Sequence, residues 1–172
     1  NVFKPLININ LFMGLFKDKP LKNKVAIVTG GTRGIGLGIA DKLASLGAKV
    51  VVCAIHPEKI KHIFIHADVS KAEDVMKVVD FTIKKFRKID ILVNNAGIFP
   101  SVMLKDMTEE NWDQIMAVNL KSMFLFTKAV MPYMIMQKGG KIINLSSIAG
   151  TSIGYPGLAH YCATKAGAIG FT

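Results

Sequence analysis

The stretch KVAIVTGGTRGIG, residues 24–36, decides the fold of this chain. Its first half is an unbroken apolar, β-branched run, which predicts a buried strand. Its second half places glycines at positions 30, 34 and 36, so the chain can turn tightly before the next helix begins. The free N–H groups at the start of such a helix can face a phosphate, but the pattern also fits a tight turn that binds no ligand.

Short β-branched runs and longer amphipathic stretches continue to alternate along the rest of the chain. Further strands are predicted at residues 49–55, 62–67, 89–95 and 141–147, and helices at 35–46, 71–87, 108–139 and 161–172. This alternation indicates an α/β protein with a doubly wound parallel sheet. Its switch point lies between the first and fourth strands, and ligands of such sheets bind there, at the carboxyl ends of the strands.

One connection is unusually short. Only about six residues separate the second predicted strand, which ends near Ile55, from the third, which begins near His62. A parallel crossover that contains a helix needs roughly ten residues or more. Either the helix is missing here, or one of the two runs is not a parallel neighbour of the other.

The composition is that of one globular domain with a basic surface. The chain has 172 residues, of which 51% are hydrophobic and 20% are charged, so it can bury a sizeable core. Its net charge of +10 favours anionic ligands, although a basic, solvated surface without a specific partner fits as well. Cys53 and Cys162 are too few for a disulfide framework, and we expect both to be reduced and packed in a cytoplasmic protein.

Other classes of protein are disfavoured by several features. Residues 1–21 form an N-terminal extension of the domain at 22–172. The apolar part of this extension is interrupted by Pro5, Asn8 and Asn10, so a signal peptide is not predicted. A membrane span is not predicted either, because the sequence contains no run of about 18 apolar residues. The lysines around the first strand lack an aromatic or groove-reading pattern, so no nucleic-acid partner is expected. The four histidines show no metal-site spacing, and no metal ligand is assigned.

Polar residues with chemical potential follow the glycine loop in a fixed order. NNAG, residues 94–97, ends the fourth predicted strand, which lies beside the glycine loop. Asn119 follows in the long helix, and Ser147 ends the fifth strand. Tyr161 and Lys165 are four residues apart, so in a helix they share one face and place a phenol beside an ammonium.

The glycine loop, NNAG and the set Asn119, Ser147, Tyr161 and Lys165 together resemble the short-chain dehydrogenase/reductase family. The resemblance spans about residues 22–172 and is specific to the family, not to a substrate. It implies a Rossmann-type sheet. The chain ends inside the helix that carries Lys165, whereas relatives continue through further strands and helices. We therefore expect a truncated chain with the C-terminal strands and helices missing.

The resemblance implies a role for each residue of the set. A free tyrosine has a pKa of about 10, too high for a base at neutral pH, and a neighbouring ammonium favours the phenolate. Tyr161 would be the acid/base, and Lys165 would favour its phenolate and bind the cofactor ribose. Ser147 would hold the substrate oxygen, with Ser146 as the alternative. Asn119 would support a proton relay through water.

The cofactor is expected to be NADP(H). The second strand ends in Cys-Ala-Ile-His without an acidic residue that would bind a ribose hydroxyl and repel a 2′-phosphate. Arg33 can reach that phosphate, with a solvated loop charge as the alternative. His56 is expected to be an exposed turn residue, with assistance to Arg33 as the alternative. Asp68 resembles the residue that contacts the adenine, or else is a helix N-cap. The residues assigned to cofactor binding are Gly30, Thr32, Arg33, Gly34, Ile35, Gly36, Asp68, Val69, Asn95, Ala96, Gly97, Tyr161 and Lys165.

The expected activity is hydride transfer between a nicotinamide and a carbonyl or alcohol carbon, with a 3-oxoacyl thioester on a carrier protein as the leading substrate. The alternative is an incomplete chain that binds nucleotide only or is inactive. A homo-oligomer is expected for the full-length protein. Large apolar side chains in the long helix are assigned to the core or to a subunit interface: Met123, Phe124, Phe126, Met131, Met134 and Met136.

Overall fold

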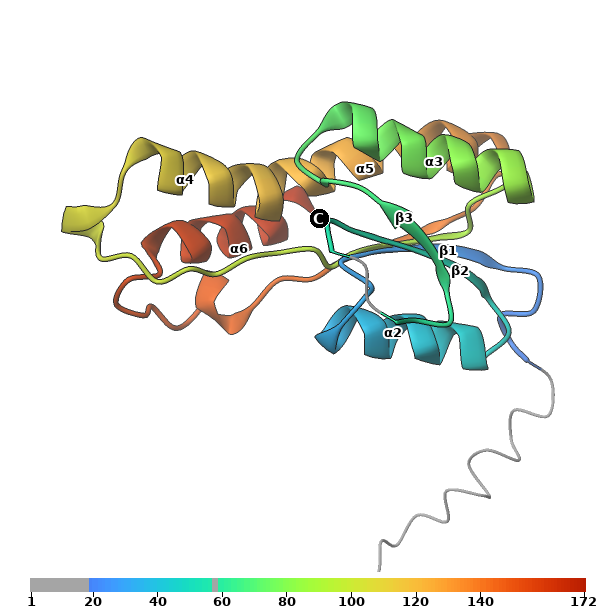
Figure 1. Cartoon of the computed structure of the whole chain (residues 1–172), viewed down its shortest axis with the longest axis horizontal. Helices are drawn as coiled ribbons and strands as arrows, with labels where there is room; N and C mark the ends of the chain where they lie inside the picture. The colour runs from blue at the N-terminus through green and yellow to red at the C-terminus, as the bar shows by residue number, and fades with distance from the viewer. Residues whose placement is uncertain (1–18, 57–58) are drawn as a thin grey trace, which may run out of the picture.

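A computed structural model describes residues 19–56 and 59–172, and within them the chain forms one parallel sheet covered by helices (Figure 1). The five strands lie in the order β3-β2-β1-β4-β5, and every neighbouring pair is parallel. Their bounds are Val25–Thr29 for β1, Lys49–Ala54 for β2, Ile63–His66 for β3, Ile91–Asn94 for β4 and Lys141–Asn144 for β5. The order reverses between β1 and β4, which confirms the predicted doubly wound fold and its switch point.

The helices lie on both sides of this sheet. Helix α2 covers one face, and α3 and α5 cover the other (Figure 1). The helix bounds are Gly34–Ser45 for α2, Ala72–Phe86 for α3, Glu109–Met116 for α4, Ser122–Met136 for α5 and Ala159–Phe171 for α6. The short 3₁₀ turns are Leu104–Asp106 and Ile148–Gly150.

The central strands are apolar on both faces because each face has its own core. Ile27 and Leu92 pack with α3 and α5 residues such as Phe126, whereas Val28 and Val52 pack with residues of α2. All five residues of β1 are buried. This two-sided burial explains why the strand reads as a continuous apolar run and not as an alternating one.

Of the two interpretations of the short connection between β2 and β3, the structure supports the one in which the crossover helix is missing. The two strands are parallel neighbours, with Val51 opposite Ile63, and the described connecting residues, 55–56 and 59–62, contain no helix. His62 ties this connection to α2, because its Nε2 lies 2.7 Å from Asp41 Oδ1 while its ring is only 7% exposed. The histidine therefore has a packing role in the fold.

The helix predicted over residues 108–139 is not continuous. It begins as expected after Thr108, whose hydroxyl accepts the Asn111 amide in a capping box. Between α4 and α5, however, residues Ala117–Lys121 form a π-helical segment, and α5 ends at Met136. Such single π turns inside α-helices occur frequently at functional sites, and this one contains Asn119.

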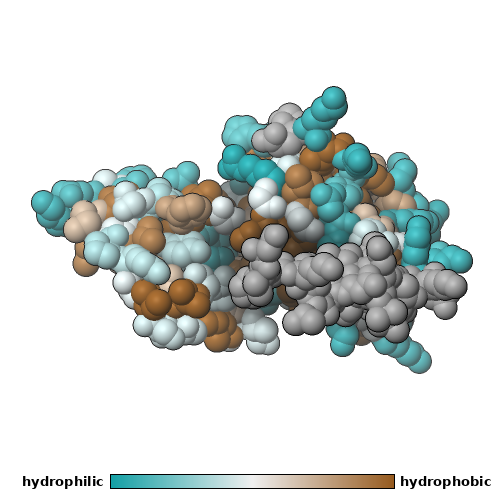
Figure 2. Space-filling model, turned by 90° about the horizontal axis from the view of Figure 1, so that it is seen from below, coloured by the Kyte–Doolittle hydropathy of each residue, from teal (hydrophilic) through white to brown (hydrophobic). Residues whose placement is uncertain are grey.

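The six large apolar side chains assigned to the core or to a subunit interface divide between the core and the surface. Met123, Phe126 and Met134 are buried, which confirms the core assignment for these three. Phe124, Met131 and Met136 are exposed, so their assignment to a subunit interface stays a prediction. Seen from the α2 side, further apolar surface gathers at the end of the molecule that carries α4 and α6 (Figure 2).

Three further predictions concern the rest of the chain. Both cysteines are free. The predicted packing of Cys53 is confirmed because its side chain is buried, and this burial raises the pKa of its thiol to about 12, whereas Cys162 is half-buried. Within residues 19–56 and 59–172, no helix combines the length and the apolar character that crossing a bilayer requires. Most of the predicted N-terminal extension, residues 1–18, lies outside the described residues.

Candidate active site

The glycine loop forms a close backbone crossing at the carboxyl end of β1. Gly30 has a φ of +62° and Gly34 a φ of +53°, a region that residues with a β-carbon rarely adopt. At Gly36 a β-carbon would lie only 2.2 Å from the Gly30 carbonyl oxygen, so no larger residue fits without a shift of the backbone. Helix α2 starts at Gly34, and its first N–H groups, which lack intrahelical partners, are available to an anion.

Hydrogen bonds join this loop to NNAG across 66 residues of sequence. Thr29 Oγ1 accepts the backbone N–H groups of Asn95 and Ala96, both at 3.0 Å. In return, Asn95 Nδ2 donates to the carbonyls of Thr29 at 2.8 Å and Gly30 at 3.2 Å. Thr29 is a site residue that the sequence analysis missed. Its signal there was its position at the end of the first strand, directly before the glycines of TGGTRGIG.

The two loops form one side of a groove of about 490 Å³ at the carboxyl ends of the strands. Phe99 and Val118 lie on another side, and Ile55 and His56 form the end beyond β2. Among residues 19–56 and 59–172, no carboxylate lines the groove, whereas Arg33 and His56 both do. Most of the residues predicted to bind a cofactor line it: Gly30, Thr32, Arg33, Gly34, Ile35, Gly36, Val69, Asn95, Ala96 and Gly97.

Asp68 does not line the groove, although its neighbours Ala67 and Val69 do. Its Oδ1 accepts the backbone N–H of Ser70 at 3.0 Å and the Ser70 hydroxyl at 2.7 Å. The alternative interpretation of Asp68 as a helix N-cap is wrong, because the N-cap of α3 is Lys71. The carboxylate instead stabilises the turn that follows β3.

Asn119 is fully buried and joins the segment after β4 to α6. Its Oδ1 accepts the Ile98 N–H and its Nδ2 donates to the Ile98 carbonyl, both at 2.8 Å. The same Nδ2 lies 3.3 Å from Thr164 Oγ1. Both amide hydrogens of Asn119 are therefore used. The second lone pair of Oδ1 has no partner among these contacts, and a water that takes part in a proton relay would bind there.

The two serines after β5 have different partners. Ser146 Oγ donates to the Lys165 carbonyl at 2.7 Å, so its proton is committed to holding α6. Ser147 Oγ accepts the Ala149 N–H at 3.2 Å. Because that contact uses a lone pair, the hydroxyl proton of Ser147 remains available to a ligand.

Tyr161 and Lys165 lie together on α6, as their spacing predicts. Lys165 Nζ lies 5.7 Å from the centroid of the Tyr161 ring and donates to the Leu145 carbonyl at 2.7 Å. The lysine is 5% exposed, and burial lowers the pKa of its ammonium. Neither residue lines the groove, but the Tyr161 ring meets the Phe99 ring edge-to-face at 6.1 Å, and Phe99 does line it.

Comparison with known proteins agrees with this geometry. A family model described as short chain dehydrogenase matches residues 24–172. A 3-oxoacyl-[acyl-carrier-protein] reductase of Synechocystis sp. is 44% identical over 165 residues, 88% of this chain and 66% of that protein. The 3-oxoacyl-[acyl-carrier-protein] reductase FabG of Staphylococcus epidermidis is 41% identical over 87% of this chain and 66% of its own length, and that of Thermotoga maritima is 38% identical over 88% and 66%.

The chain thus spans about 66% of the length of these curated relatives. The family match nevertheless covers the glycine loop, NNAG, Asn119, Ser147 and the Tyr161–Lys165 pair. With the parallel sheet and its switch-point groove, it establishes that this chain belongs to the short-chain dehydrogenase family.

Proposed function

We propose that the protein is an NADP(H)-dependent oxidoreductase that acts on a carbonyl or alcohol carbon. The observation that carries the proposal is the contact between Phe99 and Tyr161, which joins the groove behind the glycine loop to the buried Lys165. A cofactor in the groove and an acid/base group at its end are the two parts that this chemistry needs.

The groove fits a dinucleotide. Only glycine at position 36 allows α2 to approach the Gly30 carbonyl this closely, and the N-terminus of α2 offers N–H groups to a pyrophosphate. The described lining residues include no carboxylate, which supports NADP over NAD, since an acid there would repel a 2′-phosphate. Arg33, exposed at the start of α2, would bind that phosphate. We assign ribose and adenine contacts to Lys165, Tyr161 and Asp68 as part of this proposal.

When bound, the cofactor supplies the hydride donor or acceptor of the reaction. Tyr161 Oη would give a proton to, or take one from, the substrate oxygen, and Ser147 would hold that oxygen through its available hydroxyl proton. Lys165 spends one of three ammonium hydrogens on Leu145, which leaves two for the phenol and the ribose. Asn119 would hold a water through the remaining lone pair of Oδ1, and that water would relay the proton.

The substrate we infer is a 3-oxoacyl thioester carried by an acidic carrier protein. The relatives are named as 3-oxoacyl-[acyl-carrier-protein] reductases, and the net charge of +10 suits an acidic carrier. A cytoplasmic homo-oligomer belongs to the same proposal. The exposed apolar residues of α5, Phe124, Met131 and Met136, support such an interface.

Replacement of Tyr161 by Phe tests the catalytic assignment. We expect turnover of acetoacetyl thioester with NADPH to fall by roughly 10²–10⁴, because the variant removes the proton donor. NADPH should still bind, with at most the loss of the one ribose contact assigned to the phenol, because Lys165, the glycine loop and the ring that packs on Phe99 are retained. Tyr133→Phe, which removes a phenol from α5 away from the site, is the matched control and should keep full turnover. Equal turnover of Tyr161→Phe and the parent chain would contradict the role.

The alternative is a chain that binds nucleotide without catalysis. It predicts that the parent chain binds NADPH but turns over no carbonyl substrate, so Tyr161→Phe would change nothing. Measuring NADPH binding and turnover on the same preparation separates the two candidates.

A further inference from the structure

A second groove lies at the amino ends of the strands. The glycine loop lies at their opposite, carboxyl ends. Its volume is about 580 Å³, within the range of small-molecule sites. It is bordered by the starts of β1, β4 and β5 and by the ends of α3 and α5. Five cations and one carboxylate line it: Lys24, Arg87, Lys88, Lys138, Lys141 and Asp90.

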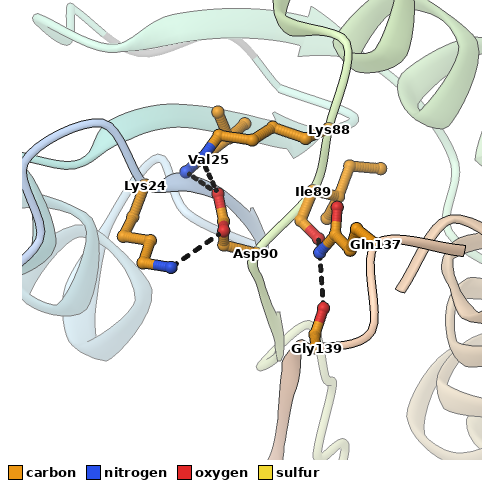
Figure 3. Close-up of polar contacts among 7 residues, drawn as sticks. All are labelled: Lys24, Val25, Lys88, Ile89, Asp90, Gln137 and Gly139. Atoms are coloured by element: carbon orange, nitrogen blue, oxygen red, sulfur yellow. Dashed lines mark hydrogen bonds and ion pairs between the residues drawn. The ribbon is translucent and has the colours of Figure 1, made fainter. Parts of the chain in front are cut away.

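The charge of Asp90 is already used inside the fold. Its carboxylate accepts the Val25 N–H at 2.9 Å and pairs with Lys24 at 3.2 Å and Lys88 at 3.0 Å (Figure 3). Burial opposes ionisation, but the Val25 amide and the two lysines together hold the pKa of Asp90 below its usual range. Arg87, Lys138 and Lys141, in contrast, form no ion pair within the described part of the chain.

Two of these cations stand at positions where glycine would be easier to accommodate. Arg87 follows α3 with a φ of +65°, and Lys138 follows α5 with a φ of +56°. A residue with a β-carbon is disfavoured in this left-handed region by about 1 kcal/mol or more. The chain therefore carries charged side chains at the groove although glycine would relieve the backbone at both positions.

The turn that carries Lys138 is also held in place. Gln137 Nε2 donates to the Ile89 carbonyl at 2.7 Å and to the Gly139 carbonyl at 2.5 Å, which fixes the end of α5 against the start of β4 (Figure 3). A cation on a fixed turn loses less entropy when it binds an anion. The groove is therefore preorganised on the side of α5.

One effect opposes anion binding here. The carboxyl ends of α3 and α5 point toward the groove, and each contributes a partial charge of about −0.5. Together they offset about one of the five cations, and Asp90 offsets another. The remaining positive charge is enough to favour an anion with several negative charges.

We propose that this groove binds a small oligophosphate anion. Arginine and lysine are the residues that bind phosphate oxygens most strongly, and Arg87, Lys138 and Lys141 are free to do so. The groove is separate from the one behind the glycine loop, because no residue lines both. The proposal therefore stands independently of the proposed oxidoreductase activity.

Calorimetric titration of the purified chain with sodium tripolyphosphate tests the proposal. The double variant Arg87→Gly/Lys138→Gly removes two groove cations and at the same time relieves both left-handed positions, so it should fold at least as stably as the parent chain. We expect it to bind tripolyphosphate about tenfold more weakly or worse. The control Lys105→Ala/Lys121→Ala removes the same charge from exposed positions outside both grooves and should bind like the parent chain.

A third variant, Arg33→Ala, separates the two grooves. It should leave unchanged the tripolyphosphate binding that Arg87→Gly/Lys138→Gly weakens, because Arg33 lines only the groove behind the glycine loop. Three results would overturn the proposal: no saturable binding by the parent chain, equal weakening in the groove variant and the Lys105/Lys121 control, or loss of binding in Arg33→Ala with retention in Arg87→Gly/Lys138→Gly.

Discussion

Adjacent serines after β5 illustrate how neighbouring residues of one type can have separate roles. Ser146→Ala removes the donor to the Lys165 carbonyl, and we expect it to lower the free energy of unfolding by about 1 kcal/mol. Ser147→Ala leaves the Ala149 N–H without its acceptor and should cost a similar or smaller free energy of unfolding, but only this variant should lower turnover. Urea unfolding and steady-state assays of both variants check this. The reverse pattern would make Ser146 the catalytic serine.

Arg33 decides the predicted preference for NADP. Arg33→Ala should weaken NADPH binding about tenfold or more, because a charge-assisted contact to the 2′-phosphate is lost, and should leave NADH binding unchanged. Fluorescence titration with both nucleotides measures the effect, with Lys42→Ala near the end of α2 as the control. If NADPH and NADH weaken by the same factor, Arg33 does not read the 2′-phosphate.

Sequence reasoning missed Thr29 and the contacts that hold the site together, because these act over long range. Thr29 accepts the Asn95 N–H across 66 residues of sequence, and the bond from Ser146 to the Lys165 carbonyl depends on how α6 docks. The Tyr161–Lys165 pair, in contrast, could be predicted because helical geometry alone brings residues four apart together.

At the scale of elements, the Asp90 carboxylate links the start of β4 to the start of β1 through a hydrogen bond and an ion pair. Asp90→Asn should lower the free energy of unfolding at pH 7 by about 1 kcal/mol or more, since it loses two lysine partners. The pKa of Asp90 is lower in the folded chain than in the unfolded chain, where it is about 4. This stabilisation is therefore complete at pH values above the pKa of the unfolded chain and is lost as the pH falls through the pKa of the folded chain.

Urea unfolding of Asp90→Asn and the parent chain between pH 7 and pH 2 checks this prediction. The gap between the two should be constant down to about pH 4 and then close on acidification. A gap that stays the same at pH 2 would contradict the assigned ion pairs.

The strands and most helices could be predicted because their apolar patterns are long and regular. All five strands occur where β-branched runs predict them, with ends that differ by up to three residues. The π-helical segment could not be predicted, because Ala-Val-Asn-Leu-Lys fits an ordinary helix. In the structure, Asn119 within it bonds to Ile98 and Thr164, and those partners come from elsewhere in the fold.

For the whole molecule, the first question is whether this chain folds and binds nucleotide as a unit. A ligand that binds only the folded state adds about 2.7 kcal/mol at a hundredfold excess over Kd. We expect a cooperative thermal melt whose midpoint rises more with NADPH than with NADH. A melt that responds to neither nucleotide would contradict the cofactor assignment.

The missing helix between β2 and β3 also affects how the sheet opens. Strand β3 lies at the edge, none of its four residues is buried, and its connection to β2 is short. Strand β1 lies between two neighbours and is buried throughout. Amide hydrogens of β3 should therefore exchange with solvent through local fraying, while those of β1 exchange only when the whole sheet unfolds. Resistance to opening therefore falls from β1 at the centre of the sheet toward the edge where the chain omits a helix.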